Sequence, residues 1–253
     1  MTTPIQPINL FEYETLAKQH LSQMALDYYA SGAWDEITLR DNRAAFERYK
    51  LRPRMLVDVS QRDLSTTIFG QTLPLPILIA PMAFQCLAHP EGEIATAKAA
   101  AKLGSTMILS TLSTKSIEAV ANASPITNYQ LPITNSRLWF QLYVHRDRGL
   151  TKALVERAYK AGYQAICLTV DAPVLGKRER DTRNQFVLPP EMELANLAAL
   201  SDLEIAYKPG ESGLFAYFLE QLNPALTWKD LEWLQSLSPL PLVVKGILRG
   251  DDA

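Results

Sequence analysis

The sequence predicts an α/β fold in which βα units build a parallel sheet. After residue 76, short apolar runs of four to seven residues alternate with amphipathic segments, which is typical of buried parallel strands separated by helices. Polar side chains recur at the ends of these runs, where parallel α/β folds carry their functional sites. The chain has 253 residues, 47% of them hydrophobic, so it can bury a sizeable core without disulfides or structural metals.

The charge balance and the cysteine content narrow the class of protein. Lysine and arginine number 25 against 27 aspartate and glutamate residues, which argues against a nucleic-acid surface. Cys86 and Cys167 both stand among apolar neighbours, which favours a reducing compartment over disulfides. No stretch approaches the roughly 18 apolar residues of a membrane span, and residues 1–10 lack a signal-peptide pattern. We therefore expect a cytoplasmic protein that binds neither nucleic acid nor membranes.

The first 75 residues predict a helical segment that ends in a short β-hairpin. Apolar residues across 11–50 recur at helical spacing, with a break after residue 30 and a second helix over about 36–46. Residues 51–75 are irregular and contain one β-like run, 66–70. We therefore expect residues 1–75 to precede the sheet rather than to belong to it.

Residues 76–253 predict about five βα units. The expected strands are 77–80, 106–109, 138–144, 165–170 and 242–244, and the expected helices are 91–103, 116–122, 150–161 and 228–237. Ser116 and Thr227 stand where N-cap residues are preferred. An insertion at 123–137 and a long loop at 177–226 interrupt the alternation, and connections of this length are usually functional lids or disordered segments.

Polar side chains at the strand ends are candidates for a site. Gln141 and Tyr143 are two residues apart and therefore share one face of their strand, as do Thr169 and Asp171 on the next. Strand ends turn polar wherever a chain leaves the core, which accounts for any one of these residues taken alone. Lys245 is the stronger case, because lysine is almost never fully buried unless it is paired. Its ammonium group is suited to holding an anionic intermediate, forming a Schiff base or pairing with Asp171.

A basic cluster, residues 177–181, follows the fourth predicted strand. A solvated charged loop is the commoner outcome for such a cluster, whereas the functional alternative is a clamp for a carboxylate, which suits the forked guanidinium group of arginine. The sequence contains neither G-x-G-x-x-G after a strand nor a P-loop, which argues against a Rossmann nicotinamide site. His20, His89 and His145 are not spaced as metal ligands, so we expect them to be structural and expect no metal site.

Several motifs, taken in order, resemble the FMN-dependent L-2-hydroxy acid oxidases, the family of glycolate oxidase and L-lactate oxidase. The motifs are DYYASG (27–32), APMA (80–83), HPEGE (89–93), FQLY (140–143), LTVDAP (168–173), LGKRE (175–179), NQFVLPP (184–190), WKD (228–230) and VKG (244–246). They extend over nearly the whole sequence, and their order and spacing carry the resemblance more than any one of them.

The resemblance implies a TIM (β/α)8 barrel, with about five βα units present after the N-terminal helical segment and with FMN across the strand ends. It implies that Ser110, Gln141 and Thr169 hydrogen-bond the flavin ring. Lys245 would lie beside the N1/C2 carbonyl edge of the ring, where its charge favours the anionic reduced flavin. The backbone facing the flavin would be that of Ala80, Pro81, Met82 and Ala83.

The resemblance also implies a small L-2-hydroxy acid as substrate and the 2-oxo acid as product. Tyr28 and Arg178 would grip the substrate carboxylate, and Tyr143 would contact the hydroxyl or the carboxylate. Asp171 would orient and stabilise a catalytic histidine, and oxygen would reoxidise the flavin to give hydrogen peroxide. At Leu112, plant glycolate oxidases carry tryptophan, so we expect the leucine to leave room for the methyl group of L-lactate beside glycolate.

An eight-unit barrel needs three more βα units, of about 30 residues each, than the five predicted here. In the family, the catalytic histidine, a substrate arginine and the phosphate-binding loops follow the fifth strand, so no residue of this sequence is assigned to them. Two alternatives stay open: a catalytically incomplete fragment that needs the C-terminal half, and a Schiff-base aldolase that uses Lys245. The resemblance implies a homotetramer for the full-length protein, and a second chain is another way to complete the barrel.

Overall fold

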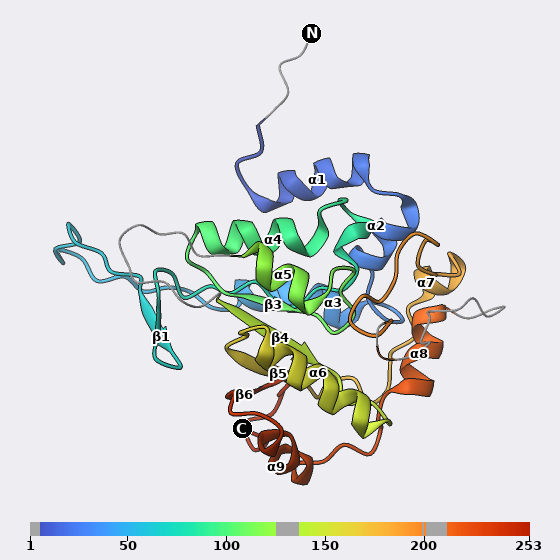
Figure 1. Ribbon diagram of the computed structural model, residues 1–253. Helices are drawn as coiled ribbons and strands as arrows, with labels where there is room; N and C mark the ends of the chain where they lie inside the picture. Colours follow the sequence, from blue (N-terminus) through green and yellow to red (C-terminus); the bar gives the residue numbers. More distant parts are fainter. Residues whose placement is uncertain (1–5, 125–136, 199, 201–211) are drawn as a thin grey trace.

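The computed structural model describes residues 6–124, 137–198, 200 and 212–253 (Figure 1). Its centre is a four-stranded sheet in the order β3-β4-β5-β6, and all three strand pairs are parallel. Strands that follow one another in sequence are neighbours in the sheet, as βα units require. The strands are β3 (Met107–Leu109), β4 (Leu138–Leu142), β5 (Ala165–Thr169) and β6 (Leu242–Lys245). The predicted parallel α/β class is therefore confirmed.

Four helices that precede or connect the strands of this sheet agree with the predicted ones. They are α4 (Gly92–Lys102), α5 (Ile117–Ala123), α6 (Arg148–Lys160) and α9 (Lys229–Ser236). The Oγ of Ser116 accepts a hydrogen bond from Ala119 N at 3.1 Å and caps α5 as expected. The apolar faces of these helices and Phe140, Leu142 and Leu168 of the sheet form the main core. Residues 125–136, which make up most of the predicted insertion, lie outside the described residues.

The N-terminal part forms three helices, where the sequence predicts two helical stretches, and a hairpin. The helices are α1 (Leu10–His20), α2 (Gln23–Ala30) and α3 (Ile37–Glu47), and the hairpin joins β1 (Thr66–Ile68) to β2 (Gln71–Leu73). Ile68 packs on a small core cluster that includes Trp139 and Cys167, and the rings of Phe69 and Trp139 are 5.6 Å apart. Because Trp139 is near the start of β4, the hairpin packs near the amino end of the sheet, away from the strand ends where a site is expected.

The predicted first strand, 77–80, is wrong as a regular strand. Ile79 forms a single parallel bridge with Met107 and bonds to the backbone of β3 at two points, through Thr106 O and Ile108 N. Pro76 and Pro81 flank this segment and cannot donate to a ladder. The described sheet consequently has four strands rather than five, and residues 77–80 lie along its β3 edge.

The long loop also differs from expectation. The loop contains two helices that the sequence did not predict, α7 (Glu179–Arg183) and α8 (Gly213–Gln221), and a short 3-10 helix, η1 (Gln85–Leu87), follows the 77–80 segment. After β6, residues 249–252 form a turn in which Asp252 N donates to Arg249 O at 3.2 Å. Within the described residues, no helix is both long enough and apolar enough to cross a membrane.

Candidate functional site at the strand ends

Three of the predicted site residues leave one face of the sheet at the carboxyl ends of adjacent strands. Trp139, Cys167 and Val243 belong to the small core cluster or pack against it. Each site residue stands two positions after one of these three side chains and therefore lies on the same face of the sheet. The three site residues are Gln141 on β4, Thr169 on β5 and Lys245 on β6. The period-two argument made from the sequence therefore places them correctly relative to one another.

Gln141 is the centre of a buried hydrogen-bond network that joins the ends of β3, β4 and β5. Its Oε1 accepts from Ser110 Oγ at 3.3 Å and from Thr111 N at 3.1 Å. Its Nε2 donates to Thr169 Oγ1 at 2.9 Å. None of the four residues is more than 5% exposed, and a buried polar group without a partner costs about 1–3 kcal/mol. The network therefore fixes which side of the Gln141 amide carries the oxygen.

Lys245 pairs with Asp171, one of the three arrangements considered for it from the sequence. The Nζ of Lys245 lies 3.3 Å from Asp171 Oδ2, and the register places Lys245 opposite Thr169. Gly246 follows with φ 111°, and a Cβ added there would lie 2.4 Å from the Cβ of Asp171. A glycine is therefore required for the ends of β5 and β6 to approach this closely.

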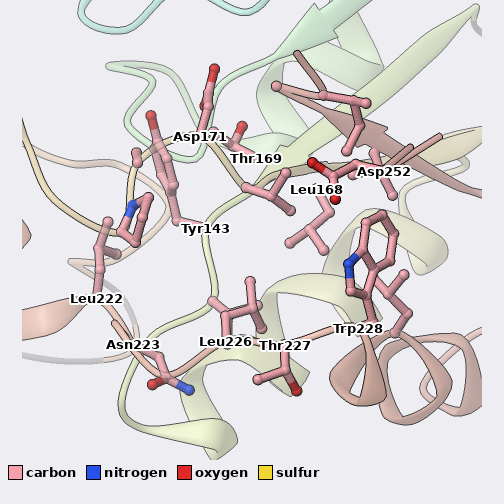
Figure 2. A pocket seen from close by; sticks show the side chains of 18 of the residues that line it. Tyr143, Leu168, Thr169, Asp171, Leu222, Asn223, Leu226, Thr227, Trp228 and Asp252 are labelled. Atoms are coloured by element: carbon pink, nitrogen blue, oxygen red, sulfur yellow. The ribbon is translucent and has the colours of Figure 1, made fainter. Parts of the chain in front are cut away.

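A cavity of about 520 Å³ lies beside these strand ends (Figure 2). Tyr143, Thr169 and Asp171 line it. The side-chain oxygen atoms of these three residues lie on the same side in Figure 2, away from Leu226 and Trp228. The volume falls within the range of small-molecule sites, which are largely apolar with a few polar groups. Ser110 and Gln141 do not line it, so the cavity adjoins the buried network rather than containing it.

Tyr143 is held just beyond the end of β4. Its backbone N–H donates to Thr111 Oγ1 at 3.2 Å. Burial raises the pKa of the Tyr143 hydroxyl to about 12, and the charge of Asp171 adds to this increase. The phenol therefore stays protonated at neutral pH and can donate a hydrogen bond to an oxygen of a bound ligand.

Tyr28 and Arg178 form a second cluster, where α2 meets α7. The ring of Tyr28 stacks on Phe186 with centroids 4.8 Å apart, and the Arg178 guanidinium lies 4.9 Å from the Tyr28 centroid. Arg178 donates to the backbone carbonyl groups of Tyr28 and Ser31 at the carboxyl end of α2. Its Nε is 3.2 Å from Asp181 Oδ2, and desolvation raises the pKa of that buried carboxyl.

Arg178 therefore links two helices in this structure, and its predicted grip on a substrate carboxylate stays a prediction. The hydroxyl of Tyr28 interacts electrostatically with that of Tyr143 at the strand ends. Burial raises the pKa of the Tyr28 hydroxyl, Arg178 opposes this shift, and the hydroxyl of Tyr143 adds to it.

The predicted flavin-facing backbone, from Ala80 to Ala83, runs beside the end of β3. Residues on either side of it are tied down: Ile79 bonds to β3, and Phe84 N donates to Leu112 O at 3.2 Å. The hydroxyl of Tyr29 on α2 donates to Phe84 O at 2.6 Å. Pro81 and Met82 within this loop are partly or largely exposed, so the loop presents its surface to solvent next to Ser110.

Two buried residues that organise these loops were not recognised as such from the sequence. Glu93 accepts hydrogen bonds from Gln85 N and Thr114 N, so it joins the loop after residues 77–80 to the loop after β3. Asn196 accepts from Ile117 N and donates to Ser113 Oγ, so it fastens the long loop to the end of β3. Glu93 lies within a recognised motif, but nothing in the sequence around Asn196 indicates this role.

The groups at the strand ends suit the polar edge of a flavin ring. That edge alternates hydrogen-bond donors and acceptors, and the buried network offers an amide and two hydroxyl groups from Gln141, Ser110 and Thr169 in adjacent strands. The ammonium group of Lys245 stands at the next strand in the row, where it can stabilise negative charge on a ring edge. The donor and acceptor chemistry of these residues is therefore compatible with the ring of FMN.

Comparisons with known proteins agree with this reading. The family model of the FMN-dependent dehydrogenases matches residues 17–253. An L-lactate oxidase from Nostoc sp. (strain PCC 7120) is 71% identical over the whole chain, which covers 68% of that protein. Glycolate oxidase 1 from Oryza sativa subsp. indica is 49% identical over 97% of the chain, which covers 63% of that protein.

Solved structures give the same result for the fold. A mandelate oxidase crystallised with (S)-4-hydroxymandelic acid superposes with a TM-score of 0.88 at 37% identity, over 97% of this chain and 66% of that one. The chain thus spans about two thirds of the length of the relatives that it matches, and its partial barrel corresponds to part of theirs. On this evidence the chain belongs to the family of FMN-dependent dehydrogenases.

Proposed function

We propose that the protein containing this chain oxidises a small L-2-hydroxy acid, L-lactate or glycolate, to the 2-oxo acid with FMN as cofactor and oxygen as electron acceptor. The observation that carries the proposal is the row of polar groups at adjacent strand ends, Ser110, Gln141, Thr169 and Lys245. Similarity to an L-lactate oxidase and to glycolate oxidases supports the substrate class. Bound FMN would accept the two electrons of the oxidation and pass them to oxygen, which gives hydrogen peroxide.

The residues of this chain would act around that cofactor in three ways. Gln141, Ser110 and Thr169 would orient the ring through hydrogen bonds, and Lys245 would hold a positive charge at its edge. The protonated hydroxyl of Tyr143 would donate to an oxygen of the substrate, and Tyr28 would assist Arg178 in binding the carboxylate. Asp171, paired with Lys245 at 3.3 Å, would orient the base that removes a proton from the substrate.

The base itself is not assigned within this chain. The three histidines are all described: His145 Nε2 is 2.7 Å from Tyr217 Oη, His89 Nδ1 accepts from Glu91 N, and His20 is exposed at the end of α1. We propose that the base comes from a part of the protein outside this sequence, either later in the same chain or in a second chain. Without that part, the chain would be the catalytically incomplete fragment considered above.

The Schiff-base aldolase is the less favoured alternative. A Schiff base requires Lys245 to act as a neutral amine nucleophile, but its ammonium group is placed against the carboxylate of Asp171. The family to which the chain belongs is flavin-dependent, which also supports the oxidase. We further propose that the protein is cytoplasmic and forms a homotetramer. Light scattering of the purified protein would measure the mass of the assembly.

Replacing Leu112 with tryptophan is expected to shift the substrate preference toward glycolate. Leu112 is 2% exposed and lies in the loop that carries Ser110. Plant glycolate oxidases carry tryptophan at this point, and we therefore propose that a larger ring there crowds the methyl group of L-lactate. A methyl group in a pocket is worth about 1–3 kcal/mol, and we expect kcat/KM for L-lactate relative to glycolate to fall about tenfold. The measurement is peroxide production with both substrates. Leu112→Met, which conserves volume, should leave the ratio unchanged, and an unchanged ratio in Leu112→Trp would contradict the assignment.

A further inference from the structure

Thr111 stands two residues after the end of β3 and contacts two predicted site residues at once. Its side chain is fully buried. The hydroxyl donates to Gln141 O at 2.6 Å and accepts from Tyr143 N at 3.2 Å. In addition, its backbone N–H donates to Gln141 Oε1 at 3.1 Å. None of these contacts follows from the role predicted for any neighbouring residue.

These contacts replace a piece of the parallel ladder. The register pairs Leu109 with Phe140, so its continuation would place Thr111 opposite Leu142. In this ladder a β3 residue bonds to the residues flanking its partner, as shown by Met107 N, which donates to Arg137 O before its partner Leu138. The backbone N–H and C=O of Thr111 would accordingly bond to Gln141 O and Tyr143 N. The Thr111 hydroxyl makes both bonds instead.

Because the Thr111 hydroxyl takes the place of its backbone groups, the backbone N–H of Thr111 can donate to the side chain of Gln141. With Thr111 N and Ser110 Oγ both donating to Oε1, the amide oxygen must face β3. The amide nitrogen then faces β5, where it donates to Thr169 Oγ1 at 2.9 Å. The orientation of a glutamine amide follows from its hydrogen-bond network, and here the network depends on the free N–H of Thr111.

We propose that Thr111 is a positioning residue whose hydroxyl stands in for the backbone ladder, so that Gln141 presents its amide nitrogen, and Tyr143 its hydroxyl, to the flavin site. The proposal rests on the proposed FMN-dependent function and extends it to a residue that does not itself contact the ligand. Thr111→Val removes the hydroxyl at nearly constant volume, whereas Thr111→Ser keeps it.

A purely structural role is the competing explanation, and the chain offers a matched control. Thr151 on α6 is also fully buried, and its hydroxyl also bridges two backbone groups, accepting from His145 N at 3.0 Å and donating to Asp147 O at 3.3 Å. Thr151→Val should therefore lower the stability much as Thr111→Val does, without altering the amide of Gln141.

The first measurement needs no flavin. Hydrogen exchange of the cofactor-free protein, resolved to single amides, should show the Tyr143 amide exchanging at least tenfold faster in Thr111→Val than in the wild type, because its acceptor is lost. Thr111→Ser should keep the wild-type rate, and Thr151→Val should accelerate the His145 amide instead. Equal rates at Tyr143 in all four proteins would overturn the ladder replacement.

The second measurement is an FMN titration of the complete protein followed by flavin fluorescence. Loss of one hydrogen bond that orients a ligand is expected to weaken FMN binding about tenfold in Thr111→Val, whereas Thr111→Ser and Thr151→Val should stay within about twofold of the wild type. Weakening by the same factor in Thr111→Ser, or none in Thr111→Val, would overturn the positioning role. A wild-type protein that binds no FMN would contradict the proposed function, while the exchange rates would still report the Thr111 bonds.

Discussion

Replacing Asp171 with asparagine in the complete protein is expected to lower kcat for L-lactate oxidation at least a hundredfold. The carboxylate lies at the cavity with Tyr143 and pairs with Lys245. A carboxylate that orients a base and stabilises its protonated form contributes about 10²–10⁴ in rate. Asparagine keeps the shape of the side chain but removes the charge, so the loss should appear in kcat more than in KM.

Asp252→Asn is the matched control for this variant. Asp252 lines the same cavity but lies in the turn that follows β6, where its backbone N–H bonds to Arg249 O, and its substitution removes the same charge from the same region. Stopped-flow measurement of flavin reduction in the three proteins separates the effect on chemistry from that on oxygen turnover. Comparable rates in Asp171→Asn and the wild type would show that this carboxylate has no part in the reaction.

Acidification is expected to destabilise the fold through His145. Its side chain is 1% exposed, and burial lowers its pKa to about 4, while the backbone of Tyr143 and the charge of Asp147 oppose the shift. Because the folded protein holds the neutral imidazole, the unfolded chain binds more protons once the pH falls below about 6.5. Stability from this group is complete above that pH, declines as the pH falls toward 4, and changes no further below 4.

The expected loss over that interval is about 3 kcal/mol, since each pKa unit corresponds to about 1.36 kcal/mol. Urea unfolding at several pH values between 7.5 and 4 measures it as the difference between the wild type and His145→Phe, which cannot titrate there. The difference cancels the titration of other groups, including Asp181. His20→Gln, which changes an exposed histidine, should follow the wild-type curve. Parallel curves for wild type and His145→Phe would contradict a buried neutral His145.

The relative placement of the strand-end side chains can be predicted from the sequence because period two is a local property. Gln141 and Thr169 each lie two residues from a core side chain of the same strand, and that spacing alone assigns their face. Pairing between neighbouring strands then brings them together, since the order of the sheet follows the order of the chain. The contact between Lys245 and Asp171 follows in the same way.

The remaining features depend on contacts between distant segments, which local patterns do not encode. Residues 77–80 have the composition of a strand, but flanking prolines and an edge position leave them a single bridge. Asn196 bonds to a helix start 79 residues earlier in the chain. The sequence predicts Arg178 only as a carboxylate clamp, and its bonds to the carbonyl groups at the end of α2 join segments about 150 residues apart in the sequence. Each outcome depends on which partners the fold brings within reach.

Anaerobic addition of L-lactate to the purified complete protein tests the central claim most directly. The proposed function predicts that the protein carries FMN, that its visible absorbance bleaches when L-lactate or glycolate is added, and that readmitted air restores the absorbance with formation of hydrogen peroxide. A complete protein without flavin, or one whose flavin absorbance is unchanged by both acids, would contradict the assignment of this chain to a 2-hydroxy acid oxidase.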